Sequence, residues 1–75
     1  MKEYVWVIRF LEDPFIRVAK TAELAYAICR EYIEEIASEE FLNECLAELE
    51  ADYTCFPEQF GCEDMCNAEK IELEG

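Results

Sequence analysis

Residues 4–10 form a short run that is apolar on both faces of an extended strand. One face holds aromatic and branched side chains, and the other is also largely apolar: Tyr4, Trp6, Ile8 and Phe10 alternate with Val5, Val7 and Arg9. Aromatic and β-branched residues favour strands, and alternation with a period of two places successive side chains on opposite faces. A strand with two apolar faces belongs in the middle of a sheet, so we predict that 4–10 is a central strand.

Two further segments show strand character. The acidic stretch before Pro14 predicts a turn, because helical conformation is disfavoured at the residue before a proline. Residues 15–19 then predict a second strand, which forms an antiparallel hairpin with the first. Residues 68–74 alternate apolar and charged side chains, which indicates a half-buried strand at a sheet edge.

The middle of the chain predicts two adjacent helices. Thr21 is a suitable N-cap for a helix over 22–37, in which apolar residues recur every three or four positions. Ser38 is a second N-cap, for a helix over 39–53. Residues 54–67 have no clear period, and we expect an irregular, Cys-rich loop there.

These elements predict an α+β fold in a single domain, 1–75, with the order ββααβ. A chain of 75 residues has room for one small core. The simplest architecture is a three-stranded sheet, order 2-1-3, with two helices packed on one face. If each element reverses direction, the last strand runs parallel to the first and pairs with it.

The charge is concentrated in the second part of the chain. The net charge is −13, and no Lys or Arg occurs between Glu31 and Glu69. Such a segment cannot neutralise phosphates, which argues against direct binding to nucleic acid. It favours a basic protein partner.

Carboxylates recur at four-residue steps along the second predicted helix. Four residues of helix rise about 6 Å, which is comparable to the spacing of successive phosphates on one strand. A solvated helix face would be the ordinary explanation, but such faces usually pair Glu with Lys, and this one does not. We therefore predict a partner-binding surface made of Glu31, Glu34, Glu35, Glu39, Glu40, Glu44, Glu48, Glu50 and Asp52.

Five cysteines leave three alternatives open. A zinc site is one, with Cys45, Cys55, Cys62 and Cys66 as ligands, although the chain has no C-x2-C pair and no His. A disulfide in the loop is the second. Free thiols are the third and the one we expect, with no metal and no cofactor, since Cys29 and Cys45 sit on apolar stripes.

Catalysis and membrane insertion are both disfavoured. The absence of His removes the commonest general base, and only two Gly are available, so there is no glycine-rich phosphate loop. The apolar run at the N-terminus is too short for a span and lacks the form of a signal peptide. We expect a cytoplasmic protein that is not an enzyme.

The pattern resembles a class of small acidic proteins encoded by phages and prophages. The residues that carry the resemblance are the capped helix start, 20–25, and the acidic closing strand, 69–74. That class includes anti-CRISPR and anti-restriction proteins that mimic DNA. The resemblance implies a phage inhibitor that binds a CRISPR effector or restriction nuclease in the host cytosol. The alternative is a small non-catalytic adaptor or homodimeric structural protein, which a zinc ion could stabilise.

Overall fold

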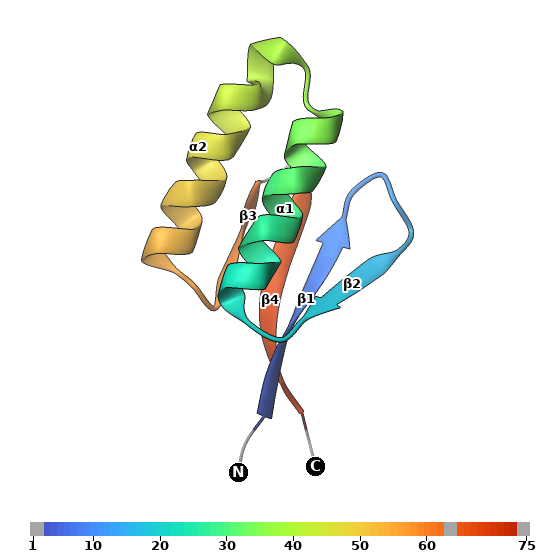
Figure 1. Cartoon of the computed structure of the whole chain (residues 1–75), viewed down its shortest axis with the longest axis vertical. Helices are drawn as coiled ribbons and strands as arrows, with labels where there is room; N and C mark the ends of the chain where they lie inside the picture. The colour runs from blue at the N-terminus through green and yellow to red at the C-terminus, as the bar shows by residue number, and fades with distance from the viewer. Residues whose placement is uncertain (1–2, 63–64, 74–75) are drawn as a thin grey trace.

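A computed structural model describes residues 3–62 and 65–73 of the chain, and it contains two helices and a four-stranded sheet (Figure 1). In chain order the elements are β1 (Glu3–Phe10), β2 (Ile16–Ala19), α1 (Ala22–Ile36), α2 (Glu39–Cys55), β3 (Gln59–Cys62) and β4 (Cys66–Leu73). The predicted α+β class is confirmed, and the order is ββααββ.

The sheet has the order β2-β1-β4-β3, and each neighbouring pair is antiparallel. The first strand is central, and the last strand pairs with it, as the sequence predicted. The three-stranded sheet and the parallel pairing were wrong. The segment expected to be a loop, 54–67, contains the end of α2, all of β3 and the start of β4. The additional strand reverses the direction of β4, and it also moves β4 from the edge to the interior of the sheet. Glu74, in the strand predicted over 68–74, lies outside the described residues.

The core lies between the sheet and the helices. Ile8, Ala68 and Phe60 are aligned across β1, β4 and β3, and all three are buried. The helices contribute buried side chains above this row, namely Ala25, Cys29 and Ile33 from α1 and Leu49 from α2. α1 contacts β1, β2 and β4, whereas α2 contacts α1 and β3. Figure 1 shows both helices on the same side of the sheet.

Aromatic rings close the ends of this core. Tyr26 of α1 stacks on Tyr53 of α2 with 4.5 Å between ring centroids, and Tyr53 meets Phe60 edge-on at 5.0 Å. At the other end of the core, the ring centroids of Phe10 and Tyr32 are 4.4 Å apart. Phe41 and Phe56 remain 53% and 66% exposed, so of the four aromatic residues in the second half only Tyr53 and Phe60 fill the core.

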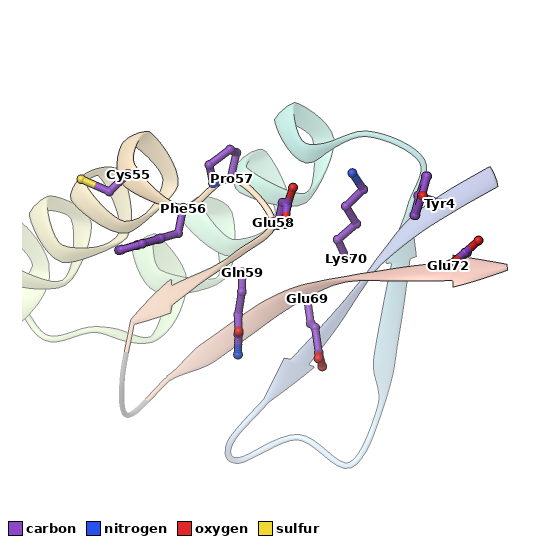
Figure 2. Close-up of a pocket in the computed structure, with 9 residues that line it drawn as sticks. All are labelled: Tyr4, Cys55, Phe56, Pro57, Glu58, Gln59, Glu69, Lys70 and Glu72. Carbon is purple, nitrogen blue, oxygen red and sulfur yellow. The ribbon is translucent and has the colours of Figure 1, made fainter. Parts of the chain in front are cut away.

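The other face of the sheet is not covered by the helices. Val5, Val7 and Ile71 alternate with the core residues, and none of them packs against the core cluster. Figure 2 shows Gln59 and Glu69 pointing to this side, away from the helices, whereas Lys70 points to the helix side. We call this surface, made by the outward residues of the four strands, the open sheet face.

The helix boundaries follow local capping and proline effects. Thr21 Oγ1 accepts a hydrogen bond from the backbone N–H of Leu24 at 3.1 Å. α2 extends to Cys55, two residues beyond the predicted end, and stops before Pro57. Among the described residues, neither helix is long and apolar enough to cross a membrane.

Candidate functional site

The predicted binding residues all lie on the two helices or at their junction. We call the nine carboxylates the acidic helix layer; all are exposed except Asp52, which is half-buried. The helices α1 and α2 together contain ten acidic residues and a single base, Arg30. The fold therefore gathers most of the negative charge on the side opposite the open sheet face.

Arg30 partly neutralises the centre of this layer. Its Nε lies 3.0 Å from Oε1 of Glu34, one turn further along α1. The hydrogen bond to Glu34 and the charge of that carboxylate raise the pKa of Arg30, and the charge of Glu50 on α2 adds to the effect. Arg30 is thus paired with Glu34, and the more weakly felt Glu50 is not within ion-pair distance of it.

A second base lies near the β2 side of α1. Arg17 lines an open groove together with Glu31 and Glu35, and Asp13 lines the same groove. These two glutamates of the acidic layer are therefore close to a positive side chain that is distant in sequence.

The carboxylates of α2 do not form a straight row. Four residues of α-helix turn about 400°, so each four-residue step drifts about 40° around the axis. Glu40 and Glu44 lie on the outer side, whereas Glu48 accepts a hydrogen bond from the Cys62 thiol of β3, with 3.6 Å between Sγ and Oε2. Asp52 follows further round the helix and is half-buried. The outer acidic face of α2, which we define as Glu39, Glu40 and Glu44, is therefore the least neutralised part of the layer.

The cysteines are arranged differently from the set of four that was considered as an alternative zinc site. Cys62 and Cys66 face each other on β3 and β4, and the pKa of the Cys62 thiol is raised to about 12 by burial and by a hydrogen bond with Cys45. The hydrogen bond with Cys66, together with burial, raises the pKa of Cys29. Cys55 is exposed at the end of α2, away from the buried thiols.

Cys45 therefore interacts with Cys62, and Cys29 with Cys66. Cys55, which the alternative zinc site included, belongs to neither pair. Within residues 3–62 and 65–73, all five thiols are free, and no group of three or more Cys, Asp or Glu side chains is placed to hold a metal ion.

An open groove of about 870 Å³ lies beside the end of α2 (Figure 2). Lys70 of β4 extends into it, and its ammonium group lies 4.3 Å from the ring centre of Tyr4 and 5.7 Å from that of Trp6. Trp6 in turn donates its indole N–H to the carbonyl oxygen of Pro57 at 3.0 Å. The only base after Arg30 in the sequence is thus engaged with aromatic rings at this end of the sheet.

Comparison of the chain with protein-family models, with curated proteins and with solved structures finds no match. The assignment of a function therefore depends on the charge and geometry of this chain.

Sequence reasoning missed the two cations beside the acidic layer. The Arg30–Glu34 contact had a signal, because the two residues are four apart on one helix. The position of Arg17 beside α1 had no signal in the sequence, since it depends on how the β1–β2 hairpin packs.

Proposed function

We propose that this protein binds a basic, nucleic-acid-binding surface of another protein and blocks it, with the acidic helix layer standing in for a nucleic-acid backbone. A phage-type inhibitor of a CRISPR effector or a restriction nuclease is the class that the sequence resemblance suggests. The proposed activity is binding and not catalysis, and it acts in the cytoplasm of the host cell.

One observation carries the proposal: the carboxylates Glu39, Glu40 and Glu44 are exposed on α2, which contains no Lys or Arg. Exposed like charges on one helix repel each other by a few tenths of a kcal/mol per pair. A face kept only for solubility gains nothing from this arrangement, whereas a face that meets Lys and Arg of a partner recovers the cost on binding.

The test measures competition with DNA. Fluorescent DNA bound to a panel of CRISPR effector complexes and restriction nucleases is titrated with this protein at several salt concentrations. We expect displacement from at least one member, with an affinity that falls as ionic strength rises, because exposed charges are screened.

A pair of matched variants localises the surface. Glu40→Lys with Glu44→Lys should weaken displacement by about tenfold or more, since two attractive contacts become repulsive. Glu12→Lys with Glu58→Lys makes the same change in net charge at two loop residues outside the acidic helix layer and serves as the control. Equal weakening in both variants would show that net charge alone, and not this surface, is responsible.

A third variant should act in the opposite direction. Arg30→Gln removes the cation that pairs with Glu34, so it increases the negative charge of the layer without touching the outer face of α2. We expect tighter binding to the same partner. Weaker binding would contradict the proposal that the whole layer faces the partner.

A further inference from the structure

The open sheet face is an apolar surface that the helices leave uncovered. Its apolar side chains come from three strands: Val5, Val7, Ile16, Val18, Ile71 and Leu73. Ile16 is 60% exposed, Val18 57% and Leu73 45%. In a monomer these side chains meet water, and contiguous apolar patches of this kind usually mark an interface.

The charges on this face are few and of both signs. Among its described residues the ionisable ones are Arg9, Glu3 and Glu69. Glu69 lies diagonally across from Arg9 on the neighbouring strand, within reach of its guanidinium. With two Glu and one Arg, the described residues of this face carry a net charge of −1 in a protein whose net charge is −13, and two copies can approach through it with their acidic helices turned outward.

We infer that the open sheet face is a homodimer interface, in which two sheets pack face to face with β1 of one copy antiparallel to β1 of the other. Packed sheets of this kind lie about 10 Å apart with side chains interdigitating. This inference is independent of the proposed function, because it concerns a surface on the opposite side of the sheet.

The order of side chains along β1 makes the face complementary to itself. Arg9, Val7, Val5 and Glu3 follow one another on this side of the strand. A two-fold axis that lies in the interface, perpendicular to the strands and between Val5 and Val7, places Arg9 of one copy opposite Glu3 of the other. The same axis places Val5 over Val7 in both copies. On β4 the same axis places Glu69 of one copy over Ile71 of the other, so the charge complementarity of the interface comes from β1.

The size of the face is sufficient for a weak dimer. Eight-residue strands such as β1 and β4 are about 27 Å long, and neighbouring strands lie about 4.8 Å apart. With two shorter strands beside them, two such faces bury on the order of 1,000 Å² in total, the lower bound for a specific interface. Interfaces at this lower bound are weak or transient, so the dimer should dissociate on dilution.

Sedimentation velocity on the purified protein, with no partner present, tests this inference. We expect a monomer–dimer equilibrium over about 1–500 μM that shifts toward dimer when salt is raised, because screening reduces the repulsion between two acidic copies. The predicted partner binding has the opposite salt dependence, so the two proposals can fail separately. A monomer at all concentrations and salt levels would overturn the inference.

Variants assign the dimer to this face. Val5→Lys with Val7→Lys, which places four lysines at the centre of the proposed interface, should weaken dimerisation at least tenfold, whereas Leu24→Lys with Phe41→Lys, which changes exposed apolar residues of the helices, should not. Arg9→Glu should weaken the dimer, and adding Glu3→Arg should restore it. A dimer that resists Val5→Lys with Val7→Lys, or that is disrupted equally by the helix control, would place the interface elsewhere. Circular dichroism of each variant verifies that the monomer remains folded.

Discussion

The thiol of Cys62 on β3 donates a hydrogen bond to the carboxylate of Glu48 on α2, with 3.6 Å between Sγ and Oε2. This contact turns one carboxylate of the acidic helix layer toward the sheet and away from the outer face. It also places a negative charge beside a buried thiol, which opposes ionisation of that thiol. The packing of α2 on β3 is therefore connected to the protonation of Cys62.

The first prediction concerns stability at alkaline pH. The pKa of Cys62 is raised from 9.0 to about 12, chiefly by burial, so the folded protein keeps a proton that the unfolded chain loses. The contribution of the Cys62 thiol to the free energy of unfolding is fully present below about pH 9. It is lost as pH rises toward 12, by about 1.4 kcal/mol per pH unit for one thiol. Urea unfolding at pH 8 and pH 10 measures the loss, and Cys62→Val, which cannot ionise, is the control. Equal losses in both proteins would contradict the raised pKa.

The second prediction concerns the reactivity of the five thiols. Cys55 is exposed, whereas Cys29, Cys62 and Cys66 are buried. Because the exposed thiolate is the nucleophile, iodoacetamide at pH 8 should modify Cys55 at least about 100-fold faster than the buried three. Peptide mass spectrometry after timed quenching measures the rates, and all five should react together in concentrated urea. Rapid labelling of Cys62 in the native protein would show that β3 is not held in place as the structure has it.

Much of the fold followed from local patterns, because those patterns report which faces of an element are buried. The two apolar faces of 4–10 correctly predicted a central strand, although the second of those faces is left open by the fold. β3 was missed because it is only four residues long, contains Gly61 and has no alternation to detect. One missed strand was enough to reverse the predicted direction of the next, since antiparallel order depends on the count of elements.

The position of the candidate site could be predicted from the sequence, but the cations that neutralise part of it could not. Helical periodicity correctly predicts that Glu40 and Glu44 are solvent-exposed, since they lie away from the apolar stripe. The proximity of Arg17 to Glu31 depends on where the hairpin packs, which no local pattern contains. The sequence pattern places Cys29 in the core but does not predict its contact with Cys66. That contact joins two positions 37 apart in sequence, so no local pattern contains it.

The third prediction compares the two helix N-caps. Thr21 Oγ1 accepts a hydrogen bond from the Leu24 backbone, but the Ser38 side chain makes no capping hydrogen bond. Thr21→Ala should lower the free energy of unfolding by about 1 kcal/mol, and Ser38→Ala should change it by less than about 0.5 kcal/mol. Urea denaturation followed by Trp6 fluorescence provides both values. A larger effect at Ser38 than at Thr21 would contradict the observed capping.

The last prediction concerns the close approach of β3 to β4 at Gly61. A Cβ atom at this position would meet the carbonyl oxygen of Cys66 and would lie 2.9 Å from Cα of Asn67, both on the neighbouring strand. Backbone atoms in a paired strand cannot move aside without disturbing the ladder, so Gly61→Ala should destabilise the protein by about 1–3 kcal/mol. Gln59→Ala, two residues earlier on the same strand and exposed, should change stability by less than about 0.5 kcal/mol. Thermal unfolding of the two variants measures the difference. Equal stability of Gly61→Ala and Gln59→Ala would contradict the close approach of β3 to β4 at Gly61 and Asn67.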